Sequence, residues 1–96
     1  MQVKFTPLAE EDLIDIALYI AQDNPERALT FTDEIESRCL GLSKHALIGA
    51  PRPELGDDFR VLPFGRYLIF YRPQVDEVLI LRVLHSARDI DGDDFT

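Results

Sequence analysis

The spacing of hydrophobic and polar residues changes along the chain. Residues 2–5 alternate polar and apolar side chains, which is typical of a short, half-buried strand. Two stretches of helical spacing follow, in which apolar residues recur every three or four positions and define one face. Beyond residue 58 the period becomes two, in runs of β-branched and aromatic residues. The pattern therefore predicts one strand, two helices and then a block of strands.

Each predicted helix begins at a polar residue followed by proline. Thr6-Pro7 and Asn24-Pro25 both supply a side-chain acceptor at the N-cap and a proline at the first helical position. The first turns then carry acids that the helix dipole favours: Glu10, Glu11 and Asp12. The first apolar stripe consists of Ala9, Leu13, Ile16, Ala17 and Ile20. The second consists of Ala28, Phe31, Ile35, Cys39 and Leu42.

The connection between the two predicted helices is short. Only residues 22–24 join them, and so few residues permit little but a roughly antiparallel arrangement. Residues 45–58 contain two glycines and two prolines, which indicates a loop. We therefore expect a helical hairpin, then a loop, then the strands.

The predicted strands form an antiparallel meander. They cover residues 59–62, 67–71 and 78–85, separated by turn-forming segments at 63–66 and 73–77. The middle strand is apolar on both faces: Tyr67, Ile69 and Tyr71 on one, Leu68 and Phe70 on the other. Two short helices can cover only one face of the sheet. The other face therefore requires the C-terminal segment or another protein to cover it.

The chain has the size and composition of one globular domain. Its 96 residues are 46% hydrophobic, and we assign residues 1–96 to a single domain. No apolar run approaches the roughly 20 residues that span a bilayer, so we expect no membrane association. Cys39 is the only cysteine, which excludes an intrachain disulfide and favours a cytoplasmic protein. Its place on an apolar stripe predicts an inert core thiol.

The charge excludes one class of activity. Ten basic and eighteen acidic residues give a net charge of −8, so direct non-specific binding of nucleic acid is not expected. Residues 89–96 form an acidic C-terminal tail, which we expect to be solvated. They do not match a calcium loop, and Cys39 and His45 do not complete a zinc site. We therefore expect no metal and no cofactor.

Six segments in order resemble the ParE branch of the RelE/ParE toxin superfamily. They are Ala9-x-x-Asp12-Leu13-x-x-Ile16, Tyr19-Ile20-Ala21, Asn24-Pro25-x-x-Ala28, Pro51-Arg52-Pro53-Glu54-Leu55, Arg66-Tyr67-Leu68-Ile69-Phe70-Tyr71 and Arg82-Val83-Leu84-His85-x-x-Arg88-Asp89. The resemblance implies an α+β fold of order β-α-α-β-β-β, with the helical hairpin packed on one face of a mainly antiparallel sheet. It also implies the toxin of a type II toxin–antitoxin system, neutralised by a ParD-like antitoxin and inhibiting DNA gyrase. The alternatives are a RelE-type, ribosome-dependent mRNA endonuclease, or a degenerate, non-toxic protein that only binds an antitoxin.

The nuclease alternative would use four residues, Glu54, Arg60, Arg82 and His85. Such a reaction needs a base, an acid and cations around the phosphorane. His85 and the arginines could supply the acid and the cations, but no lysine follows Lys44, which leaves Glu54 as the nearest base. We expect instead that Arg82 and His85 connect the C-terminal segment to the sheet, and that the protein acts by binding rather than as an enzyme.

Two sets of residues are predicted to meet other proteins. An antitoxin segment is expected to bury apolar surface, with arginines pairing its carboxylates; this set is Leu18, Arg52, Leu68, Phe70, Tyr71 and Arg72. The target is expected to contact the C-terminal segment through Arg82, His85 and Arg88. Tyr19, Tyr67 and Tyr71 are interpreted as core or interface aromatics rather than as a nucleic-acid stacking surface.

Overall fold

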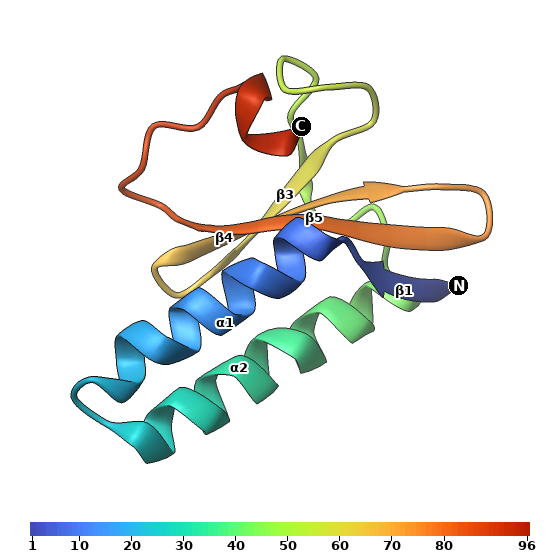
Figure 1. Cartoon of the computed structure of the whole chain (residues 1–96). Helices are drawn as coiled ribbons and strands as arrows, with labels where there is room; N and C mark the ends of the chain where they lie inside the picture. The colour runs from blue at the N-terminus through green and yellow to red at the C-terminus, as the bar shows by residue number, and fades with distance from the viewer.

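The helices and strands follow one another in the predicted order. The computed structural model describes all residues from 1 to 96 and is α+β, with two helices and a five-stranded mixed sheet (Figure 1). The elements are β1 (Gln2–Phe5), α1 (Pro7–Ala21), α2 (Pro25–Leu40), the 3-10 turn η1 (Gly41–Ser43), β2 (Ala50–Pro51), β3 (Arg60–Phe64), β4 (Tyr67–Pro73), β5 (Glu77–His85) and the 3-10 turn η2 (Gly92–Phe95). Neither helix has the length and apolar character that crossing a bilayer requires.

Both predicted helix starts are confirmed. The Thr6 side chain accepts a hydrogen bond from the Ala9 N–H at 3.2 Å, and Asn24 accepts from the Arg27 N–H at 3.0 Å. Each side chain thus satisfies a backbone donor that has no partner within its own helix. The second helix ends at Leu40, so the last residue of the predicted stripe, Leu42, lies in η1, where it is still buried.

The strand order in the sheet is β1-β5-β4-β3-β2. The helical hairpin carries the chain from β1 to the opposite edge of the sheet, and the meander returns it, so that β1 and β5 lie side by side and parallel. All other neighbouring strands are antiparallel. The register between β4 and β5 shifts once: Phe70 pairs with Arg82 but Tyr71 pairs with Ile80, which leaves Leu81 as an extra residue in a β-bulge.

The predicted boundaries around the first meander strand were wrong. The strand runs from Arg60 to Phe64 instead of ending at residue 62, and the turn has two residues instead of four. Gly65 makes the tight turn possible because its φ is +57°, in the left-handed region that glycine adopts without strain. The predicted loop over 45–58 also contains β2, where Ala50 pairs with Val61.

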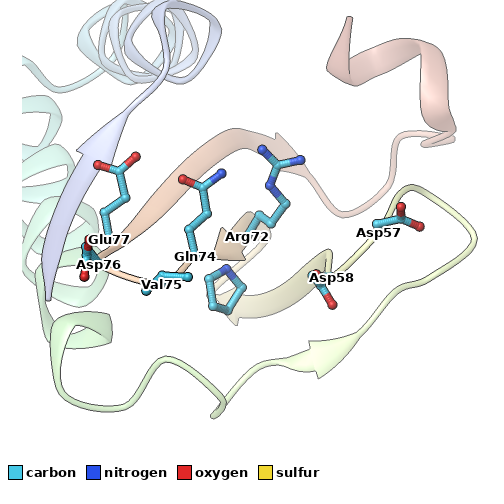
Figure 2. Close-up of a pocket in the computed structure, with 8 residues that line it drawn as sticks. Asp57, Asp58, Arg72, Gln74, Val75, Asp76 and Glu77 are labelled. Atoms are coloured by element: carbon cyan, nitrogen blue, oxygen red, sulfur yellow. The ribbon is translucent and has the colours of Figure 1, made fainter.

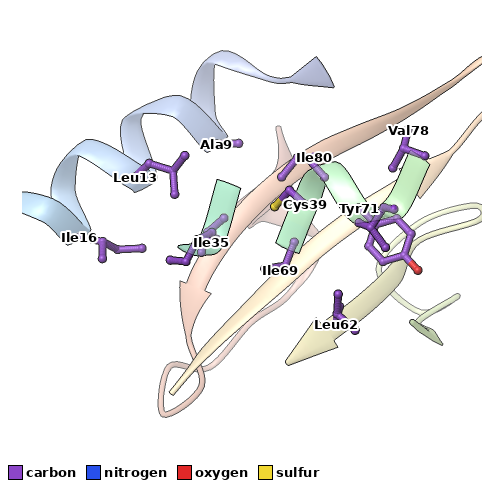
Figure 3. Close-up of a cluster of buried hydrophobic side chains, with 12 residues drawn as sticks. Ala9, Leu13, Ile16, Ile35, Cys39, Leu62, Ile69, Tyr71, Val78 and Ile80 are labelled. Atoms are coloured by element: carbon purple, nitrogen blue, oxygen red, sulfur yellow. The ribbon is translucent and has the colours of Figure 1, made fainter. Parts of the chain in front are cut away.

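The main core lies between the helical hairpin and the inner face of the sheet (Figure 3). It contains Ala9, Leu13, Ile16, Ile35, Cys39, Leu42, Leu62, Ile69, Tyr71, Val78, Ile80 and Val83. Cys39 is fully buried, and the loss of solvation raises the pKa of its thiol to about 12, with Glu36 adding to the effect. The thiolate is therefore not formed at neutral pH, in agreement with the prediction of an inert core thiol.

Candidate interaction surface

The outer face of the sheet is covered by the chain's own C-terminal segment. After β5 the chain turns back over the sheet, on the side opposite α1 and α2, and ends beside the loop that precedes β3 (Figure 1). A second apolar cluster forms there around Val61, Phe70 and Leu84, and Ile90 and Phe95 pack against it. One of the two predicted covers, the C-terminal segment, is thereby confirmed. The prediction of a solvated tail was wrong for Ile90 and Phe95, because their side chains have apolar neighbours to contact.

Phe95 is the anchor of this segment. Its ring centroid lies 5.3 Å from that of Phe70 and 5.1 Å from that of Phe59, both in edge-to-face orientation. A capping box between Asp91 and Asp94 holds the turn that presents Phe95. The Asp94 carboxylate accepts from the Asp91 N–H, and the Asp91 carboxylate accepts from the Asp93 N–H, both at 2.9 Å. A short and strongly acidic segment is therefore ordered by a capping box and by the packing of one half-buried ring.

Arg82 connects all three layers of the molecule. Its guanidinium donates to both oxygens of Asp12 on α1, each at 2.7 Å, and its third bond goes to the backbone carbonyl of Asp94 in the tail. The Arg82 side chain is 14% exposed and that of Asp12 is 8% exposed. Arg82 connects the C-terminal segment to the sheet, as predicted, through its hydrogen bond to the Asp94 carbonyl, whereas its ion pair joins β5 to α1. The hydrogen bond to Asp12 raises the pKa of Arg82, so the guanidinium stays charged.

Asp12 also closes an open edge of β5. The short β1 pairs only with Glu77–Ile80, so the later residues of β5 have β4 on one side and no strand on the other. Asp12 accepts from the Val83 N–H at 2.9 Å, and the Thr6 hydroxyl donates to the Leu81 carbonyl at 3.0 Å. The sequence indicated Asp12 as an acid near the helix N-terminus and as part of a family motif, but not this role. The available signal was its position: an acid one residue before Leu13 falls within the buried stripe.

The four nuclease candidates are not brought together. Arg82 is bound to Asp12, and Glu54 accepts from the Arg52 Nε at 2.6 Å in an exposed loop. Arg60 and His85 lie two strands apart and four register positions apart, which is about 13 Å along the strands and about 10 Å across them. A general acid must lie about 3 Å from the substrate atom that it protonates, and the arginines that would hold a phosphate beside it are each bound to other groups of this chain.

Arg60 has a local structural task. It donates to the backbone carbonyls of Leu47 and Gly49, at 3.2 and 2.7 Å. The Gly49 N–H in turn donates to the Tyr71 hydroxyl at 2.8 Å, and burial raises the pKa of that phenol. A Cβ on Gly49 would lie 2.6 Å from the same hydroxyl, so the close approach requires glycine. Arg60 and Tyr71 thus fix the loop that leads into β2.

The apolar residues predicted to bind the antitoxin differ in exposure, and only some of them lie at the surface. Leu18 projects from α1 with 63% of its surface exposed, and Leu68 is half-buried on the outer face. Phe70 and Tyr71 are fully buried, so neither presents surface to a partner. Phe95 covers Phe70, and Tyr71 points into the main core. The two could not share one surface, because successive residues of a strand face opposite sides.

Of the two arginines predicted to contact the antitoxin, only Arg52 makes an ion pair within the chain. Arg52 pairs with Glu54 and lies over the Phe70 ring, 5.8 Å from its centroid. Arg72 faces a pocket of about 580 Å³ beside the β4–β5 turn, which four carboxylates line: Asp57, Asp58, Asp76 and Glu77 (Figure 2). Arg72 makes no ion pair with these carboxylates, but an acidic partner would meet their negative charge beside it. The side chains do not form a group of three or more metal ligands anywhere in the structure.

Of the three predicted target contacts, only His85 is free and exposed. Arg82 is buried, and Arg88 pairs with Asp94, whose pKa is lowered by the Asp91 N–H and further by Arg88. The His85 Nδ1 accepts from the Ala87 N–H at 3.1 Å, a bond confined to the turn after β5. Its tie to the C-terminal segment is therefore local, whereas that of Arg82 is long-range.

Comparison with known proteins identifies relatives over nearly the whole chain. Residues 3–90 match the family described as ParE toxin of type II toxin-antitoxin system, parDE. A solved chain from the chromosomal ParDE system of P. aeruginosa is 30% identical, with a TM-score of 0.75 over 88% of this chain and 95% of that one. A chain of the RelBE2 toxin-antitoxin complex from Mycobacterium tuberculosis is 29% identical, with a TM-score of 0.66 over 91% of this chain and 92% of that one. No protein of curated function matches the sequence.

Proposed function

Because the chain belongs to the ParE family of type II toxin–antitoxin toxins, we propose that it inhibits DNA gyrase by binding and is neutralised by a ParD-like antitoxin. The two solved relatives come from a ParDE system and from a RelBE complex, which supports an antitoxin as the partner. The prediction that the protein is not an enzyme is part of this proposal.

The state of Arg82 is the observation that carries binding over RNA cleavage. A phosphorane requires a free cation, and the Arg82 guanidinium already holds two carboxylate oxygens and a carbonyl. Freeing it would leave the Asp12 carboxylate buried and unpaired. We therefore assign Arg82 a role in stabilising the fold rather than in binding a phosphorane.

The net charge points in the same direction. Ribosomal RNA is a dense polyanion, and a chain with a net charge of −8 is repelled from it. Contact with a protein target depends instead on local complementarity, which a mixed surface can provide even when the overall charge is negative.

We expect that expression of this chain alone slows bacterial growth and that co-expression of its antitoxin restores growth. Replacing His85 by glutamine should leave toxicity in place at a somewhat higher dose, because glutamine still offers one neutral hydrogen bond. Loss of a general acid would instead lower activity on the order of 10²–10⁴-fold. Growth curves over a range of induction measure the difference.

Primer extension on mRNA from the induced cells is the matched control. The proposal predicts no new cleavage at the ribosomal A site. A folded, antitoxin-binding His85→Gln variant without toxicity at any dose would contradict action by binding. Normal growth with abundant, folded wild-type protein would leave only the degenerate-toxin alternative.

A further inference from the structure

A shallow pocket lies where the last turn of α1 passes the β3–β4 turn and the end of β5. It has a volume of about 330 Å³ and is lined by Tyr19, Arg66, Tyr67 and His85. Tyr67 and His85 are register partners, and their rings meet edge to face with centroids 5.3 Å apart. Tyr19 comes from α1 and is 70% exposed. The walls are thus aromatic, with one arginine and one histidine.

Its charge sets this pocket apart from the rest of the surface. No carboxylate lines it, although the chain carries eighteen. Each of the other three pockets has at least one: four beside the β4–β5 turn, Asp58 between β2 and β3, and Asp33 with Glu34 on α2. An anionic group would therefore meet no carboxylate here, whereas each of the other three pockets sets at least one carboxylate beside its single arginine.

The hydrogen-bond donors of this pocket are not used within the chain. The Arg66 guanidinium makes no ion pair and no hydrogen bond, whereas its backbone carbonyl accepts from the Ser86 N–H at 2.8 Å and fixes the turn against the end of β5. Because the His85 Nδ1 accepts from Ala87, a neutral His85 ring carries its proton on Nε2. A planar guanidinium and an imidazole N–H are the donors that a carboxylate accepts from.

We propose that the pocket of Tyr19, Arg66, Tyr67 and His85 binds a carboxylate side chain of the antitoxin, with a neighbouring apolar residue of the antitoxin on the tyrosine rings. The inference rests on the proposed function and names the anchor of that interface. Binding there would also cover His85.

A single carboxylate fits the molecule better than a nucleic acid does. A polynucleotide would bring many phosphates to a surface whose net charge is −8, and only one unpaired arginine lines this pocket. A protein segment can place one acid at the pocket and present neutral or basic residues to the acidic surroundings. The chemistry therefore favours an acidic residue within a segment of mixed charge.

The test is calorimetric titration of the full chain with a purified ParD-like antitoxin. Arg66→Gln is expected to weaken binding about tenfold or more, since hydrogen bonds to charged groups are the stronger class. Arg66→Lys should weaken it less, because the charge stays while the bidentate geometry is lost. Arg38→Gln is the matched control: it removes the same charge from an exposed arginine of α2 that also lacks an ion pair. A thermal melt verifies that each variant is folded.

The salt dependence separates a direct contact from a structural effect. Binding of the wild type should weaken with added NaCl more steeply than binding of Arg66→Gln. If Arg66→Gln binds as well as Arg38→Gln, the pocket is not the anchor and the inference is overturned while the proposed function stands. If the wild type does not bind the antitoxin at all, both are overturned. Binding of a single-stranded RNA oligonucleotide that needs Arg66, without antitoxin binding, would assign the pocket to nucleic acid and also overturn the inference.

Discussion

Replacing Asp12 by alanine is expected to lower the free energy of unfolding by about 3–5 kcal/mol, the range found when one partner of a buried ion pair is removed. The substitution leaves the Arg82 guanidinium without its carboxylate and the Val83 N–H without an acceptor. For a domain whose total stability is about 5–15 kcal/mol, this is a large fraction. Urea denaturation followed by circular dichroism measures the change.

Asp15→Ala is the control for the loss of an acid from the same helix. Asp15 is exposed and makes no ion pair, so its replacement should change stability by less than about 0.5 kcal/mol. The double variant Asp12→Ala, Arg82→Met should recover part of the loss, because no unpaired charge then remains buried. An Asp12→Ala variant as stable as Asp15→Ala would show that the pair does not hold the layers together.

Replacing Phe95 by alanine is expected to lower the free energy of unfolding by about 2–3 kcal/mol. Complete burial of a phenylalanine would give about 3–5 kcal/mol, and Phe95 is only half-buried. The ring fills the space between Phe59 and Phe70, so its loss uncovers the outer apolar cluster. Urea denaturation gives the energy, and increased binding of an apolar dye reports the uncovered face.

Val75→Ala is the matched truncation of an apolar side chain. Val75 is 92% exposed in the β4–β5 turn, so its replacement should have almost no effect on stability. Equal stabilities of Phe95→Ala and Val75→Ala would mean that the C-terminal segment does not close the outer face in solution.

Much of this fold could be predicted because its signals are local. The two N-caps depend on residues three positions apart, and the period-two runs mark strands without knowledge of their partners. The apolar character of both faces of β4 also predicted that something besides the helices must cover the sheet. What covers it depends on contacts between Phe95 and residues of β4 far away in the sequence, which periodicity does not encode.

The candidate site was less predictable, because its geometry depends on packing between elements. Phe70 and Tyr71 looked like surface residues in an incomplete sheet, and each is buried once its own face is covered. The direction of Arg82 depends on a bulge at Leu81, which shifts the register with β4 and for which the sequence contains no glycine or proline signal. In the sequence Arg66 is recognisable only as part of a family motif, because the absence of carboxylates around it is a property of the folded chain.

The most direct test of the account is a supercoiling assay with purified DNA gyrase, relaxed plasmid and this chain. If the chain inhibits gyrase by binding, supercoiling should fall or cleaved DNA should accumulate in proportion to the toxin added. An equimolar amount of the antitoxin should relieve the effect. Full supercoiling activity at every dose, with codon-linked mRNA cleavage in cells that express the same protein, would contradict the account.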